Sequence, residues 1–281
     1  MEGEVLNKIL LKERVRLEGD LISPSPDFDI KTDRDRVVSI RTGGENILQR
    51  LLPEGWTLVA LPAYAGPSSS QVNILLRTVE FQISFLNTQF LSPRIILAHE
   101  MGHVNDPLLR ERAAEVVRLF VSINPAGIDE LADSSFDTMW LYADEIRASS
   151  LSREAIADIL FEMFSTKIQI ELEGMRRGEQ FCDVLNIPIN IYKEFSTRKL
   201  VADYFYGDLL IIVEILRGED LKGDVAPQKT FQILSPELDG SALEVSWEWL
   251  LANEHKLVEV RDTLREEIKS IENRVIQAQG K

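Results

Sequence analysis

The sequence predicts an α+β fold, with a small twisted sheet and an active-site helix in the N-terminal half and a mostly helical C-terminal half. Residues 36–86 contain short β-branched and alternating segments, which are typical of strands. Several segments between residues 108 and 173, and then residues 200–216 and 242–279, repeat apolar side chains at the three- and four-residue spacing of helices. Between the strand segments and the first of these helices, residues 92–106 combine a short apolar run with two histidines four residues apart, which indicates a helix that carries a site.

Three segments of the N-terminal part predict strands. Residues 36–40 and 56–62 are short apolar runs, and residues 45–52 between them have helical spacing. Residues 78–86 alternate, with four apolar side chains expected on one face: Val79, Phe81, Ile83 and Phe85. An exposed edge of that strand could hold an extended peptide by strand addition. The alternative is a strand that is simply part of the sheet.

The remainder of the chain predicts helices at residues 108–120, 136–150, 152–173, 200–216 and 242–279. The last has apolar residues spaced by sevens, fours and threes, so it could pair with a second copy of the chain and form a homo-oligomer. Packing against its own domain is the alternative. We divide the chain into an N-terminal segment (1–30), a core (31–175) and a helical C-terminal region (176–281).

Composition limits the partners that we expect. The 281 residues are 44% hydrophobic, enough for a buried core, and no apolar run has the length of a membrane span. The 31 basic and 46 acidic residues give a net charge of −15, which argues against nucleic acid or an anionic membrane as the principal partner. The single cysteine, Cys182, and an N-terminus without the pattern of a secretion signal indicate a cytoplasmic protein.

The pattern His99-Glu100-Met-Gly-His103 predicts a zinc site. Residues four apart share one face of a helix, so both imidazoles can bind one metal ion while Glu100 lies beside them. Zn²⁺ lowers the pKa of a bound water to about 7, and an adjacent carboxylate can then take up its proton. The chain has only 3 histidines, so a chance occurrence of this spacing is a poor explanation. The alternative is a helix with two surface histidines.

A catalytic zinc ion with two histidines needs a third protein ligand, commonly a carboxylate, and keeps its fourth position open. Glu154 and Glu145 compete for this role. Nine residues of continuous helix would place them on nearly opposite faces, so both can bind only if the helix breaks near Ser149. Glu154 shares its face with Asp158, one turn later, and both lie opposite an apolar stripe.

His99-Glu-Met-Gly-His103 followed by Glu154-Ala-Ile-Ala-Asp158-Ile resembles the gluzincin metallopeptidases, and the second segment is similar to one in thermolysin-like enzymes. The resemblance covers about residues 78–172 and implies a zincin-like fold. It also implies that Glu100 is the general base of peptide-bond hydrolysis and that Asp158 hydrogen-bonds a histidine ligand. The zinc ligands that it implies are His99, His103 and Glu154.

We therefore expect a zinc metallopeptidase that acts on a protein or peptide substrate, with a restricted intracellular protein as its target. The alternative is a non-catalytic or regulatory binding protein that retains a zincin fold. Three further residues are candidates for stabilising the transition state: Tyr204, Tyr206 and His255. The alternatives are tyrosines that pack in the core and a histidine on an exposed helix face.

Overall fold

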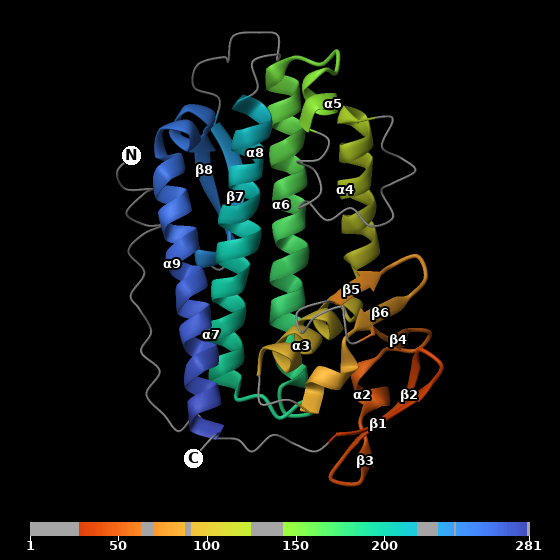
Figure 1. The fold of residues 1–281 in the computed structure, drawn as a ribbon. Coiled ribbons are helices and arrows are strands. Elements are labelled where there is room, and N and C mark those ends of the chain that lie inside the picture. Colours follow the sequence, from red (N-terminus) through yellow and green to blue (C-terminus); the bar gives the residue numbers. More distant parts are fainter. Residues whose placement is uncertain are drawn as a thin grey trace. The chain divides into compact units, whose positions relative to one another are not determined.

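The computed structural model describes residues 28–62, 70–87, 91–124, 143–217, 230–238 and 240–279 (Figure 1). Helices predominate and a sheet forms near the N-terminus, as expected for an α+β protein. The described residues belong to two compact units that interleave along the chain. The sheet unit contains residues 28–109, 173–198 and 266–279, and the helical unit contains residues 110–172 and 199–265.

The sheet has the strand order β1-β2-β4-β6-β5, with β3 paired to β2. The pairings are antiparallel except for that of β4 with β6. Among the described residues β5 pairs with β6 alone, so its other side is an edge of the sheet. The strands are β1 (Asp29–Asp33), β2 (Arg36–Thr42), β3 (Glu45–Asn46), β4 (Thr57–Ala60), β5 (Ser70–Asn73) and β6 (Thr78–Phe81).

The strand expected at residues 78–86 is shorter than the alternating pattern suggested. β6 ends at Phe81, and Ile83–Asn87 form a 3₁₀ helix. β6 is hydrogen-bonded to β4 on one side and β5 on the other, so the alternative of a strand that is simply part of the sheet is confirmed. The edge that could accept an extended peptide belongs to β5.

Helix α3 (Ser92–Val104) is buried on almost every side, with Pro93 in its first turn. Its Leu97 and Met101 pack in one core with Val79 and Phe81 of the sheet. Helices α2 (Leu48–Leu51) and α7 (Ile189–Lys199) contribute to the same core. A helix so enclosed is held rigidly, which suits the positioning of functional side chains.

The helical unit is built around α6 (Arg153–Gly178), the long green helix of Figure 1. Side chains of α4, α6, α8 and α9 share one core, which includes Phe120, Phe164, Ile212 and Leu250. Two strands pair as an antiparallel hairpin that packs on this core. The other elements are α4 (Leu109–Ile123), α5 (Ala143–Arg147), a π-helical segment (Leu200–Gly207), α8 (Asp208–Arg217), β7 (Thr230–Ser235), β8 (Ser241–Ser246) and α9 (Trp247–Gln279).

Two of the predicted helices differ from the structure. Residues 200–216 begin with eight residues of π-helix before α8. The helix expected at 242–279 begins only at Trp247, because Ser241–Ser246 form β8, where Leu243 and Val245 are buried. Of the helix expected at 136–150, residues 136–142 lie outside the described residues and Ala143–Arg147 form α5.

The apolar side of α9 packs against its own chain. Leu257 and Leu264 join the core of the helical unit, and Ile268 and Ile271 join the core of the sheet unit. Packing within the chain therefore accounts for these positions of the heptad-like pattern, and pairing with a second copy stays a prediction. None of the described helices combines the length and the apolar character needed to cross a membrane.

Candidate metal centre

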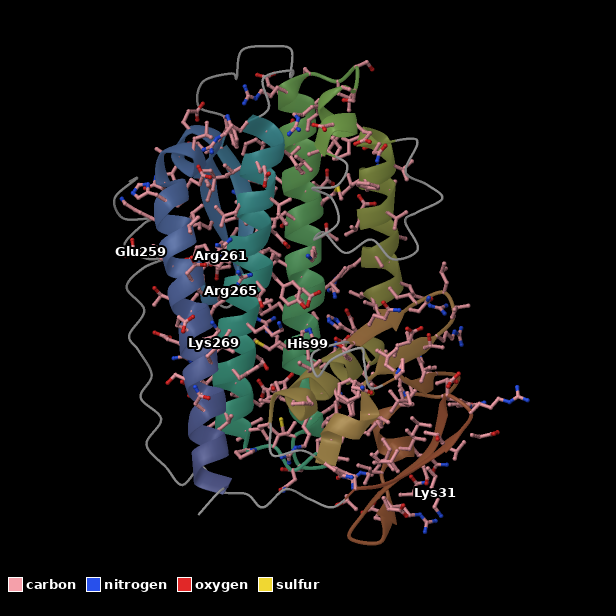
Figure 2. The ribbon with its side chains drawn as sticks, viewed as in Figure 1. Lys31, His99, Glu259, Arg261, Arg265 and Lys269 are labelled. Atoms are coloured by element: carbon pink, nitrogen blue, oxygen red, sulfur yellow. The ribbon has the colours of Figure 1, made fainter. Side chains whose placement is uncertain are left out.

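Helix α3 directs both motif histidines toward one point. The Nε2 atoms of His99 and His103 lie 2.9 Å apart, with the two rings nearly perpendicular at 82°. His103 is buried, and His99, labelled in Figure 2, is half-buried. Two nitrogens bound to one tetrahedral zinc ion at about 2.0–2.1 Å are roughly 3.3 Å apart, so a small outward shift of either ring fits this pair to a metal ion.

The third potential ligand of this group comes from α6. Glu171 joins the two histidines in a group whose potential ligand atoms all lie within 4.8 Å of one another. Two imidazoles and one carboxylate are a ligand set that zinc uses in catalytic sites, where its fourth position stays open. The residues present therefore fit a metal ion of this class.

Four small residues explain why α6 comes so close to α3. Ala98 and Gly102 lie one turn apart on α3, as do Gly174 and Gly178 on α6. A methyl group at Gly102 would lie 1.9 Å from the carbonyl oxygen of Gly174, and one at Gly178 would lie 2.8 Å from that of Ala98. The two backbones are in direct contact, which larger side chains would prevent.

The same crossing places α6 against the ring of His103. A methyl group at Gly174 would lie 2.4–2.8 Å from three atoms of the His103 ring. Glu171, Gly174 and Gly178 are spaced by three and four residues, so they share one face of α6. The carboxylate of Glu171 is therefore on the face that packs against α3.

Polar contacts hold this crossing in place. The hydroxyl of Tyr192, on α7, donates to the carbonyl oxygen of Met175 at 2.8 Å. Arg177 pairs with Glu173, Nε to Oε2, at 3.3 Å. Arg177 also donates through an Nη to the carbonyl oxygen of Asn105 at 3.4 Å, at the end of α3. Of these three contacts, the bond from Arg177 to Asn105 joins α6 to the end of α3, so it is the one that restricts sliding of the two helices.

Glu100 has a different partner from the two histidines. The hydroxyl of Ser70, the first residue of β5, donates to Oε1 of Glu100 at 2.7 Å. Glu100 does not belong to the group formed by His99, His103 and Glu171. Its carboxylate is thus held by a hydrogen bond to β5, the strand at the edge of the sheet.

The structure does not bring Glu154, Asp158 or Glu145 to the histidines. Glu154 is exposed in the first turn of α6, 17 residues before Glu171, which is roughly 25 Å along the helix axis. Asp158 lies one turn further on, still distant from Glu171. Glu145 is exposed on the short helix α5. The similarity to a thermolysin-like segment lies at the end of α6 that does not cross α3.

The candidates for transition-state stabilisation also lie elsewhere. Tyr206 is fully buried in the core of the helical unit and donates to Oε2 of Glu237 at 3.2 Å. The Tyr204 ring lies under the ammonium group of Lys167, 5.2 Å from the ring centroid. His255 is exposed on α9. For Tyr206 the alternative of a packing tyrosine accounts for its position.

Two residues of the site, Glu171 and Ser70, were not found from the sequence. The useful pattern was the pair of small-residue repeats, Ala98/Gly102 and Gly174/Gly178, which predicts a close helix crossing. A carboxylate one turn before the first glycine of the second pair would then have been the natural candidate for the third ligand.

Comparisons of this chain with models of protein families, with curated proteins and with solved structures found no match.

Proposed function

We propose that the protein is a zincin-like, zinc-dependent metallopeptidase in which His99, His103 and Glu171 hold the metal and Glu100 is the general base. The observation that carries this proposal is the convergence of the two histidines of the His-Glu-x-x-His motif with a carboxylate from a second helix. Glu171 takes the role that the sequence had suggested for Glu154. When bound there, zinc would polarise the substrate carbonyl and acidify a water molecule.

The other residues of the site supply proton transfer and substrate alignment. The water oxygen attacks the scissile carbonyl carbon, while Glu100 accepts a proton from the water. Glu100 then delivers this proton to the amide nitrogen as the carbon–nitrogen bond breaks. The hydrogen bond from Ser70 to Oε1 fixes the carboxylate, so that its second oxygen can face the water.

The edge of β5 is the surface that we assign to the substrate. Strand β5 consists of Ser70–Asn73, and it contacts α3 within the sheet unit. An extended peptide hydrogen-bonded along this edge would run past Glu100, because Ser70 of β5 is hydrogen-bonded to the Glu100 carboxylate. Main-chain pairing of this kind holds a protein or peptide substrate with little regard to its sequence, so selectivity would come from other contacts.

The test compares the parent protein with Glu100→Gln on a mixture of random-sequence peptides, with cleavage followed by mass spectrometry and zinc by atomic emission. Glu100→Gln keeps the shape of the side chain and removes the base, so hydrolysis falls by about a hundredfold or more while zinc stays bound. Glu154→Gln, the matched control on exposed α6 surface, leaves both unchanged.

Unchanged hydrolysis in Glu100→Gln would contradict the assignment of the base. A parent protein that binds zinc but cleaves no peptide in the mixture would instead favour the alternative function, a non-catalytic binding protein with a zincin fold.

A further inference from the structure

A second site lies in the helical unit, where the π-helical segment faces α9. A pocket of about 360 Å³ opens there, within the size range of small-ligand sites. A π-helix widens the backbone turn and is frequent at functional sites. Six side chains line this pocket: Lys199, Asp203, Tyr204, Ile211, Arg261 and Arg265.

The lining is cationic in a chain whose net charge is −15. Lys199, Arg261 and Arg265 contribute three positive charges against the single carboxylate of Asp203. Arg261 and Arg265 lie one turn apart on α9, where Figure 2 shows them in sequence with Lys269. Such a local excess of positive charge favours an anionic ligand.

The cationic side chains are held in place before any ligand arrives. Asp203 accepts from Nζ of Lys199 at 3.0 Å and from Nε of Arg265 at 2.8 Å. Burial alone would raise the pKa of Asp203, but Lys199 and Arg265 outweigh burial and hold the pKa below its ordinary value. The carboxylate is thus ionised and fixes both cations, which lowers the entropy cost of binding.

These ion pairs leave donors for a ligand. A guanidinium group has five N–H donors, and the bond from Arg265 to Asp203 engages its Nε. Arg261 pairs with Asp262, which is exposed and is not part of the lining. Two guanidinium groups and an ammonium group match the three terminal oxygens and the double negative charge of a phosphate monoester.

Tyr204 and Ile211 give the lining of the pocket an aromatic and an aliphatic part. The Tyr204 ring has Lys167 over it, and Lys167 is itself paired with the fully buried Asp208 at 3.0 Å. This arrangement fixes the ring as a flat contact surface. Together with Ile211 it can cover the organic part of a ligand whose charged end faces α9.

We propose that this pocket binds a small phosphate monoester, with its phosphate between Lys199, Arg261 and Arg265 and its organic part against Tyr204 and Ile211. The proposal is independent of the metal centre, because none of these residues belongs to the group around His103. A phosphate bound to zinc instead would not depend on the arginines of α9.

Isothermal titration of the 281-residue chain with phenyl phosphate and with inorganic phosphate, in low-salt buffer, tests the site. Phenyl phosphate binds one-to-one and more tightly than inorganic phosphate, because only the ester contacts Tyr204. Arg261→Gln and Arg265→Gln each weaken its binding by about tenfold or more, since each removes a charge-assisted hydrogen bond. Lys269→Gln, the same change of charge one turn later on α9, leaves the affinity unchanged because Lys269 pairs with Glu266 outside the pocket.

Circular dichroism accompanies each titration. Arg265→Gln loses the ion pair with Asp203 and can unfold for that reason. In that case the affinity of Arg261→Gln for phenyl phosphate tests the proposal, since the partner of Arg261 is the exposed Asp262. No saturable binding up to about 10 mM phenyl phosphate would overturn the proposal. Equal affinity in the parent and Arg261→Gln, or an equal loss in Lys269→Gln, would also overturn it.

Discussion

Gly174 of α6 lies so close to His103 of α3 that a methyl group at its Cα would be 2.4 Å from Cε1 of the imidazole. The backbone of one helix is therefore a wall of the proposed metal site on the other. It sets the position of the His103 ring, and Glu171 approaches the site from the preceding turn of the same helix. Helix packing and metal binding are consequently linked at this point.

The first prediction is that Gly174→Ala lowers both zinc affinity and thermal stability. The added methyl group has to displace the His103 ring or separate the helices, and overpacking of this kind costs about 1–3 kcal/mol. Gly207→Ala is the control, because a methyl group there would meet its nearest neighbour at an ordinary 3.6 Å. Chelator competition and thermal unfolding measure the two effects. Similar zinc affinity in both variants would show that this contact does not position His103.

The second prediction concerns Ser70, whose hydroxyl orients the proposed base. Ser70→Ala removes a hydrogen bond worth about 1 kcal/mol, so peptide hydrolysis falls roughly fivefold through kcat while zinc content stays constant. Ser70→Thr keeps the hydroxyl and restores activity. Gln71→Ala, which changes the next residue and its bond to Glu80, has no such effect. If Ser70→Ala and Ser70→Thr lose activity equally, the hydroxyl is not responsible.

The third prediction is that the thiol of Cys182 resists modification in the folded protein. Burial, followed by the charges of Glu179 and Asp183, raises the pKa of this thiol to about 12. Because the thiolate is the reactive form, modification by a disulfide reagent at pH 8 is slower by about a hundredfold or more in the folded protein than in denaturant. The rate in the folded protein rises as the pH increases toward that pKa. Equal rates with and without denaturant would contradict this.

Local features of the fold were predictable from the sequence. The spacing of His99 and His103 depends only on helix periodicity, and α3 forms where it was expected. The apolar stripe of α6 was equally local, and its Ile156, Leu160 and Met163 are buried as the pattern indicated. The predicted start of the last helix, at residue 242, was wrong. The apolar residues at 243 and 245 fit the alternation of a strand as well as the spacing of a helix, and pairing with β7 makes this segment a strand.

The position of Glu171 could not be derived from such local patterns. It lies 68 residues after His103, and only the glycine pair that follows it, Gly174 and Gly178, distinguishes it from other helical carboxylates. Its role depends on which end of a 26-residue helix crosses α3, and this is decided by backbone contact at glycines. A short sequence similarity at the other end of the helix favoured Glu154. Such a similarity carries no information about which end of the helix crosses α3.

The zinc affinity of two glutamate variants tests the central claim most directly. Zinc binding by the parent, Glu171→Ala and Glu154→Ala is measured by metal analysis and competition with a chelator. We expect about one zinc ion per chain in the parent and in Glu154→Ala, and an affinity lowered by about a hundredfold or more in Glu171→Ala, which loses one of three protein ligands. Full affinity in Glu171→Ala, together with its loss in Glu154→Ala, would contradict the site proposed for this protein.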